Sequence, residues 1–147
     1  MPRFTTFLMV LASYCLSGFA HADFKAGFAA YNRGDYALAL QEFKPLAEKG
    51  DRDAQFNLAQ MYAAGRGVPQ DYVAAAAWFS KAAQQGDVGA QRFLGQMYWM
   101  GHGVPKSVPE AINWWSAAAR NGDVLAAYSL GTLYLQGMAS QNLFQRL

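Results

Sequence analysis

The chain has 147 residues, of which 53% are hydrophobic, a formal net charge of +2 at pH 7 and a single cysteine. So small an excess of positive charge predicts no binding to nucleic acid or to an anionic membrane surface. The lone cysteine excludes an intramolecular disulfide, so the fold must be stabilised by burial of apolar side chains.

The first 22 residues have the pattern of a secretory signal peptide. Arg3 precedes an apolar stretch over residues 7–16, and Ala20-His21-Ala22 is a small-x-small cleavage site. The stretch is about half as long as the roughly 20 residues that a transmembrane helix needs. We therefore expect an exported, periplasmic protein that does not insert into the membrane after cleavage. The alternative is an uncleaved amino-terminal anchor.

A helical repeat domain is expected over residues 23–137, and it begins with a helix pair over residues 24–49. Arg33-Gly34 is the expected turn between the two helices. Pro45 lies inside the second helix, where it removes a backbone hydrogen bond. We expect it to kink or shorten that helix.

The sequence then repeats itself with a period of 36 residues, marked by Gly50, Gly86 and Gly122. Within each copy, small and apolar residues recur at i, i+4, i+5 and i+8, which is one face of a helix and is incompatible with a strand. A period of this size is typical of solenoid proteins. The positions that agree between copies include Ala54, Ala90 and Ala126, then Leu58, Leu94 and Leu130, then Tyr62, Tyr98 and Tyr134.

Each copy is predicted to form two antiparallel helices, over residues 53–85 and 89–121, followed by a last helix over residues 125–136. The segment Gly65-Arg66-Gly67-Val68-Pro69 and its copy at 101–105 are expected turns, because glycine adopts positive φ and proline cannot donate to a continuing helix. Asp71 and Ser107 stand where the N-caps of the second helices are expected. The fold class is therefore all-α, a solenoid of antiparallel helix pairs.

The repeat pattern fails after Gly137, where the second glycine and the valine of the earlier turns are absent. Residues 138–147 are expected to form either a frayed tail or a capping segment, with Leu143, Phe144 and Leu147 in a short helix. The last repeat helix then lacks a normal partner. We expect self-association through this end, because three side chains would be partly uncovered, namely Leu130, Tyr134 and Leu135.

The phrase Gly-Asp-x-x-Ala-x-x-x-Leu-Gly-x-x-Tyr-x-x-Gly-x-Gly-Val begins at Gly86, and Ala-x-x-Trp-Phe-x-x-Ala-Ala-x-x-Gly begins at Ala75. Together they resemble the Sel-1-like repeat family, a relative of the tetratricopeptide repeats. The resemblance implies a right-handed α-α superhelix that serves as an adaptor or scaffold for protein complexes. Exported bacterial members are associated with cell-envelope assembly, exopolysaccharide secretion, signalling regulation and host interaction.

Positions that differ between copies are candidates for binding, because shared positions serve packing and turns. If the first helix of each copy lines the concave side, as in the related repeats, these side chains face a bound protein or peptide. The alternative is that they are partly buried or idle surface. The candidates are Phe56, Gln60, Arg92, Gln96, Trp99, Met100, Tyr128 and Thr132.

The tryptophans divide into two groups. Trp78, Trp114 and Trp115 lie on second helices, the first two at equivalent positions, and packing between repeats is expected of all three. Trp99 has no aromatic counterpart in the other copies, so it is either a core gap-filler or part of a soft apolar patch for a partner. A second candidate ligand is a carbohydrate, peptidoglycan or exopolysaccharide, which aromatic and amide side chains such as Tyr128 and Gln60 would bind.

We expect no enzyme, no metal and no cofactor. The chain after residue 22 contains no thiol, no Ser-x-x-Lys triplet and no phosphate-cradling glycine motif. Its single histidine, His102, occupies the turn position that Arg66 holds in the preceding copy. Because cysteine-rich members of the resembled family have been linked to β-lactam chemistry, a weak β-lactamase-like hydrolase is the remote alternative.

Overall fold

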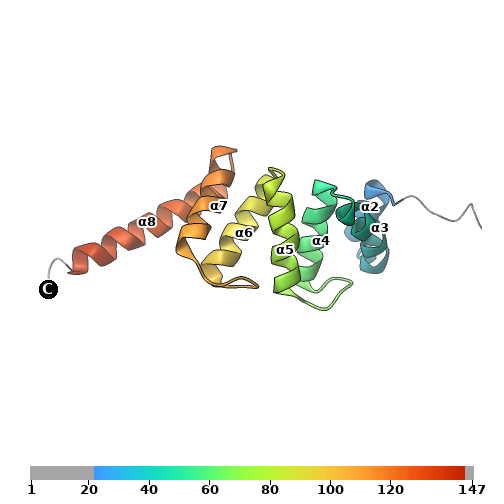
Figure 1. The fold of residues 1–147 in the computed structure, drawn as a ribbon, viewed down its shortest axis with the longest axis horizontal. Coiled ribbons are helices and arrows are strands. Elements are labelled where there is room, and N and C mark those ends of the chain that lie inside the picture. The colour runs from blue at the N-terminus through green and yellow to red at the C-terminus, as the bar shows by residue number, and fades with distance from the viewer. Residues whose placement is uncertain (1–21, 145–147) are drawn as a thin grey trace, which may run out of the picture.

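The computed structural model describes residues 22–144, so nearly all of the signal peptide expected over residues 1–22 lies outside the described part of the chain. The described residues form seven helices in a single elongated row (Figure 1). Their bounds are α2 (Phe24–Asn32), α3 (Tyr36–Glu48), α4 (Arg52–Ala64), α5 (Tyr72–Gln84), α6 (Val88–Met100), α7 (Val108–Arg120) and α8 (Val124–Phe144).

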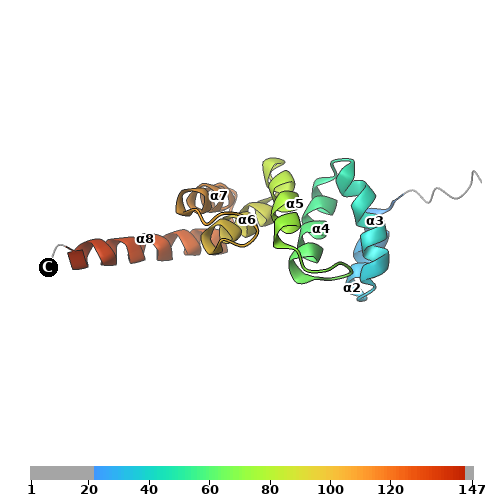
Figure 2. The same cartoon turned by 60° about the horizontal axis from the view of Figure 1, so that its bottom comes forward.

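Each helix packs mainly on the helices that precede and follow it in the chain. Figure 2, which turns the row by 60°, shows the same order from α2 at one end to α8 at the other. We call α4, α6 and α8 first-type helices and α3, α5 and α7 second-type helices. This neighbour-to-neighbour packing is the architecture of an α-solenoid.

Aspartate or serine side chains start the repeat helices as the sequence predicts. The Asp71 carboxylate accepts hydrogen bonds from the backbone N–H groups of Val73 and Ala74, and the Ser107 hydroxyl accepts one from Glu110. Each bond satisfies a backbone donor that the first turn of a helix leaves without a partner. The cap residues therefore fix where each helix begins.

Two glycines shape each long turn. Gly65 and Gly67 have φ of 66° and 72°, and Gly101 and Gly103 repeat these values at 75° and 71°. A Cβ atom on Gly103 would lie 2.0 Å from the carbonyl oxygen of Tyr72, at the start of the preceding second-type helix. The turn of one repeat thus presses against the previous repeat at a point where only glycine fits.

Of the two effects expected of Pro45, a kink or a shortened helix, the shortening does not occur. The helix continues past Pro45 to Glu48 and has 13 residues, as many as each of α4 to α7. Phe43 and Ala47, on either side of the proline, are buried in the first core cluster. Their burial holds the helix together across the one missing hydrogen bond.

The prediction for the carboxyl-terminal end is also wrong. Instead of a helix over residues 125–136 followed by a separate cap or tail, α8 runs without a break from Val124 to Phe144, and Leu147 lies outside the described residues. Ala139 and Gln141 stand where the earlier turns have their second glycine and their proline. With no residue to stop the helix, Gly137 remains helical and does not adopt positive φ.

The core consists of three clusters along the row. The first lies between α2, α3 and α4, the second between α4, α5 and α6, and the third between α6, α7 and α8. Trp78 packs against the first and second clusters, and Trp114 of α7 packs against the second. The prediction that these two tryptophans serve packing between repeats is therefore confirmed. Of the helices in residues 22–144, none is long and apolar enough to cross a membrane.

Candidate functional site

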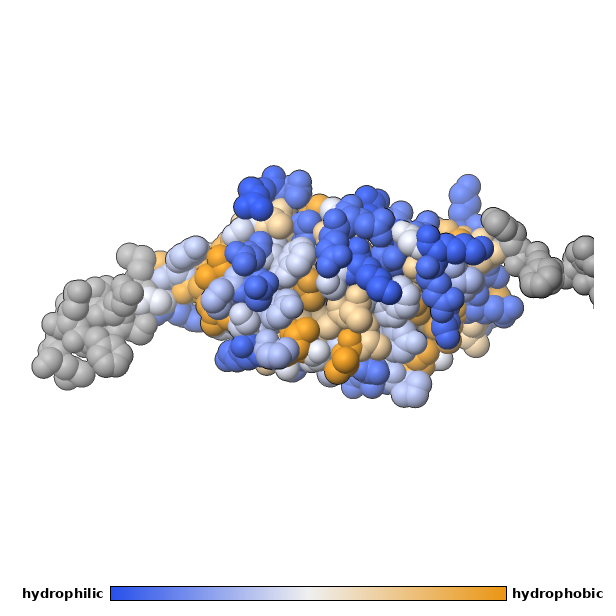
Figure 3. All heavy atoms as spheres, viewed as in Figure 1, coloured by the Kyte–Doolittle hydropathy of each residue, from blue (hydrophilic) through white to orange (hydrophobic). Residues whose placement is uncertain are grey.

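Two hollows of about 450 Å³ each lie between successive first-type helices. We call them the α4–α6 hollow and the α6–α8 hollow. Gln96 and Met100 of α6 line both of them, so the two hollows are neighbours, and we call them together the recess. The face shown in Figure 3 mixes apolar areas with hydrophilic side chains along the row of helices.

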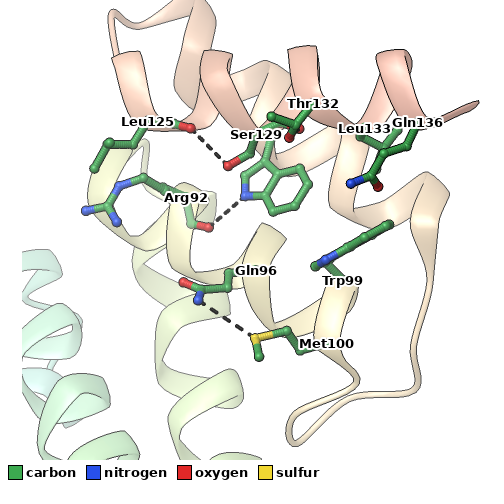
Figure 4. A pocket seen from close by; sticks show the side chains of 10 residues that line it. Arg92, Gln96, Trp99, Met100, Leu125, Ser129, Thr132, Leu133 and Gln136 are labelled. Atoms are coloured by element: carbon green, nitrogen blue, oxygen red, sulfur yellow. Dashed lines mark hydrogen bonds between the residues drawn. The ribbon is translucent and has the colours of Figure 1, made fainter. Parts of the chain in front are cut away.

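The α6–α8 hollow is walled by Trp99 and Trp115, whose ring centroids are 6.2 Å apart (Figure 4). The Trp115 indole is held in place because its Nε1–H donates to the carbonyl oxygen of Arg92 at 3.1 Å. Trp99 is half-buried, and the ammonium nitrogen of Lys106 lies 5.4 Å from the centre of its ring. The α8 wall consists of Leu125, Ser129, Thr132, Leu133 and Gln136.

The polar side chains of this hollow are held by neighbours. Arg92 Nε donates to the Asp123 carboxylate at 3.0 Å, and that carboxylate also caps α8. The Ser129 and Thr132 hydroxyls donate to carbonyl oxygens of their own helix. Gln96 Nε2 lies 3.8 Å from the Met100 sulfur, a weak contact that a ligand can replace. Gln96 is therefore an amide that a partner can reach.

The α4–α6 hollow has an apolar floor and a polar rim. Phe79 and Phe93 stack with ring centroids 5.2 Å apart, and Met97 lies beside them. The amides of Gln60 and Gln96 lie on its two sides, one on each first-type helix. This combination offers apolar contact area and directional hydrogen bonds to the same ligand.

Two side-chain pairs that the sequence analysis did not identify lie at the α4–α6 hollow. One joins an arginine to a tyrosine, and the other stacks a histidine on a tyrosine. Arg66 donates to the Tyr31 hydroxyl, and its guanidinium carbon lies 5.5 Å from the centre of that ring. This hydrogen bond raises the pKa of Arg66. His102 stacks on Tyr72 with ring centroids 4.9 Å apart. The sequence did offer one sign of these pairs, because Arg66 and His102 occupy equivalent positions 36 residues apart.

The structure brings six of the eight predicted binding residues to the recess. The other two, Phe56 and Tyr128, line neither hollow. Phe56 packs against Phe79 and Phe93 in the second core cluster, whereas Tyr128 is 71% exposed on another face of α8. Phe56 and Tyr128 are equivalent to Arg92, which bonds to Asp123 at the start of the following first-type helix. Side chains at this position therefore point toward the following repeat. The six that line the recess are Gln60, Arg92, Gln96, Trp99, Met100 and Thr132.

The recess contains two guanidinium groups. Arg66 and Arg92 line it, and none of the described residues that line either hollow is acidic, but Arg92 is paired with the adjacent carboxylate of Asp123. Nor do residues 22–144 bring together three or more His, Cys, Asp or Glu side chains in a group that could hold a metal ion. The arrangement suits recognition of a ligand with apolar and anionic groups.

A row of antiparallel helix pairs with a recess along its first-type helices defines an α-solenoid of the repeat-protein class, whose surfaces serve binding. The family model of the Sel1 repeat matches residues 52–87, 88–123 and 124–145, which is more than half of the chain. The chain belongs to the Sel1 repeat family. The three matched segments begin 36 residues apart, which is the period of the repeat.

Solved structures of Sel1 repeat proteins share this fold. The chain is 30% identical to a Sel1 repeat protein from Oxalobacter formigenes, with a TM-score of 0.74 over 78% of this chain and 47% of that one. It is 36% identical to c5321, a protective antigen of uropathogenic Escherichia coli strains, with a TM-score of 0.75 over 88% of this chain and 29% of that one. The expected right-handed all-α superhelix is confirmed.

A curated relative is the exopolysaccharide production negative regulator of Rhizobium leguminosarum bv. viciae, which is 46% identical over 48 residues. The match covers 33% of this chain and 18% of the regulator, so the chain spans less than half the length of each of these three relatives. Sel1 repeat proteins act as scaffolds for protein interactions and are typically not catalytic.

Proposed function

We propose that this protein is an exported adaptor in the bacterial cell envelope that binds an extended peptide segment of a partner protein in the recess. The observation that carries the proposal is that two hollows follow one another along consecutive repeats and share Gln96 and Met100. Neighbouring hollows along consecutive repeats accommodate a chain segment better than a compact small molecule.

The chemistry of the recess favours a segment with apolar and acidic side chains. Apolar side chains of the segment would contact Phe79, Phe93 and Met97, while its backbone would hydrogen-bond to Gln60 and Gln96. Its carboxylates would lie near the Arg66 guanidinium in the α4–α6 hollow, where no lining carboxylate repels them. Binding should therefore weaken as the salt concentration rises.

Capture from a cross-linked envelope fraction, followed by mass spectrometry, tests the adaptor. The tagged wild type is compared with a Gln96→Ala/Trp99→Ala/Met100→Ala variant and with a control variant, Gln41→Ala/Lys44→Ala, on the exposed surface of α3. We expect a specific protein with the wild type and the control, and its loss from the recess variant at unchanged helicity. Undiminished capture by the recess variant would contradict the proposal.

Export is supported by the sequence of residues 1–22 and is tested separately. Expression of the tagged full chain in a bacterium, followed by cell fractionation and mass measurement, should give a periplasmic protein that begins at Asp23. A full-length product in the cytoplasm would contradict this part of the proposal. An uncleaved product in the membrane fraction would support the amino-terminal anchor instead.

Carbohydrate binding is the second candidate because Trp99 stands half-buried beside the amide of Gln96 in the α6–α8 hollow. Aromatic rings stack on sugar faces, and amides bond to hydroxyl groups. Titration with peptidoglycan fragments or exopolysaccharide should then change the tryptophan fluorescence of the wild type and not that of Trp99→Ala. The remote hydrolase alternative predicts cleavage of a chromogenic β-lactam by the purified protein, and an intact substrate would dispose of it.

A further inference from the structure

One face of α8 is apolar and uncovered within the described part of the chain. Its residues succeed one another along a single stripe of the helix, on another side from the wall of the α6–α8 hollow. Gly131 lies at the middle of the stripe. We call this stripe the outer face of α8, and its members are Val124, Ala127, Tyr128, Gly131, Tyr134 and Leu135, all of them exposed.

The repeat shows that the equivalent face of α6 is normally covered. Gly95 of α6 corresponds to Gly131, and a Cβ atom on Gly95 would lie 2.5 Å from the Trp115 ring of α7. At Gly131 no atom of the described residues lies within 4 Å of such a Cβ position. The outer face therefore has the shape of a helix-packing surface, with a central glycine that allows close approach of another helix.

The outer face is also large and uncharged. Val124, Tyr128 and Leu135 are 78%, 71% and 68% exposed, and residues 124–144 include no Asp, Glu, Lys or Arg. Together the six residues expose on the order of 500 Å² of mainly apolar surface, which is near the upper limit for the largest patch on a typical monomer. Standard interfaces bury about 800 Å² on each partner, so this stripe supplies most of one.

We propose that two copies of this protein pair through their α8 helices, antiparallel and crossing at Gly131. The stripe is complementary to itself, because large side chains flank Gly131 one turn before it, at Tyr128, and one turn after it, at Tyr134 and Leu135. In an antiparallel pair about a two-fold axis, Tyr128 packs against the partner's Tyr134 and the two glycines meet at the axis.

Charge and position favour a second copy over a different protein. A helix without charged side chains offers no electrostatic selection of a foreign partner, and it meets no like-charge repulsion when it meets itself. Figures 1 and 2 show α8 extending past α7, so part of it stands clear of the other helices of residues 22–144.

Light scattering and sedimentation across the micromolar range measure the association of the full chain. The wild type is expected to shift from monomer to dimer as its concentration rises. The Tyr128→Lys/Leu135→Lys variant should remain monomeric with unchanged helicity, because both side chains are already exposed. A monomeric wild type at the highest concentration would overturn the proposal, whatever else binds the outer face.

Cross-linking tests the geometry. Replacing the single cysteine by Cys15→Ser allows one new cysteine to be introduced at Gly131 or, as the control, at Gln136 on the hollow side of α8. On mild oxidation the Gly131→Cys protein should form a disulfide dimer at least about tenfold faster than the Gln136→Cys protein, since pairing raises the local thiol concentration. Equal rates would contradict pairing through the outer face.

Discussion

The glycines of this chain fill different roles that the repeat alignment alone does not separate. Gly86 and Gly103 both have positive φ, at 86° and 71°. A Cβ atom on Gly86 would meet open space, whereas one on Gly103 would collide with the Tyr72 carbonyl. Both glycines are thus needed for their positive φ, but only Gly103 is also needed because a side chain would not fit.

Substitution of the two glycines by alanine separates the two requirements. Gly86→Ala should lower the free energy of unfolding by about 1 kcal/mol, the strain of an alanine in the left-handed region. Gly103→Ala should lower it by more than about 2 kcal/mol, because the turn must also move away from α5. Urea unfolding measures both values, and equal losses would show that the contact at Gly103 does not constrain the turn.

A pair of equivalent glutamines is hydrogen-bonded differently in successive repeats. Gln55 Oε1 accepts a bond from Gln85 Nε2 at 2.8 Å, but the corresponding Gln91 Oε1 is buried and has no hydrogen-bond partner among the described residues. The residue equivalent to Gln85 is Asn121, which is one methylene shorter and donates to the Ala117 carbonyl instead. The second interface therefore lacks a bond that the first one has.

Restoring the longer amide should stabilise the protein. Asn121→Gln is expected to raise the free energy of unfolding by about 1 kcal/mol, the typical net value of one hydrogen bond. The reverse change at the other interface, Gln85→Asn, should lower it by a similar amount. Thermal and urea unfolding of both variants check the pair, and a destabilised Asn121→Gln protein would contradict the explanation.

The sequence predicts part of the candidate site because variable repeat positions can be read directly. Gln96, Trp99 and Met100 line the recess as expected. Phe56 could not be separated from them, since its burial depends on the neighbouring Phe93, which only the packing reveals. The binding role of the recess residues stays a prediction until a partner is captured.

At the scale of the helices, most boundaries could be predicted because they depend on local chemistry. Aspartate or serine caps and turn glycines stop and start α4 to α7 within a few residues of the predicted positions. Pro45 and Gly137 misled the prediction, because each has a strong local tendency that the rest of its helix overrides. At Pro45 the burial of neighbouring side chains keeps the helix intact. At Gly137 the helix continues because no residue stops it.

Alanine at Gly137 tests whether α8 is continuous. In a helix interior, Gly137→Ala should raise helicity and stabilise the distal part of α8 by about 0.5–1 kcal/mol. Gly101, its equivalent in the preceding repeat, has φ of 75°, so Gly101→Ala should destabilise the protein instead. Circular dichroism and thermal unfolding report both effects, and a loss of stability in Gly137→Ala would show that α8 ends there.

At the scale of the whole molecule, the helices at the two ends differ from those in the middle. α4, α5 and α6 each have substantial packing contacts with a helix on both sides, whereas α8 packs mainly on α7. In a one-dimensional array, a unit with one neighbour opens more easily than a unit with two. The α6–α8 hollow therefore stands on the less stable side of the recess.

Amide hydrogen exchange should show this gradient. In the monomeric Tyr128→Lys/Leu135→Lys variant, backbone amides of α8 are expected to exchange faster than those of α4 to α6, because α8 opens without unfolding its neighbours. Mass spectrometry of peptides from each helix measures the rates. Uniform protection along the whole chain would show that the solenoid opens as a single cooperative unit.

The packing of each helix on its chain neighbours also determines how far apart in sequence the contacting residues are. The side-chain hydrogen bonds from Arg66 to Tyr31 and from Gln85 to Gly50 join residues 35 positions apart, which is about one repeat. Folding therefore requires no closure of a long loop, and such local topologies reach the native state quickly. Each helix pair can form as soon as the preceding pair offers it a surface, so the recess assembles stepwise along the chain.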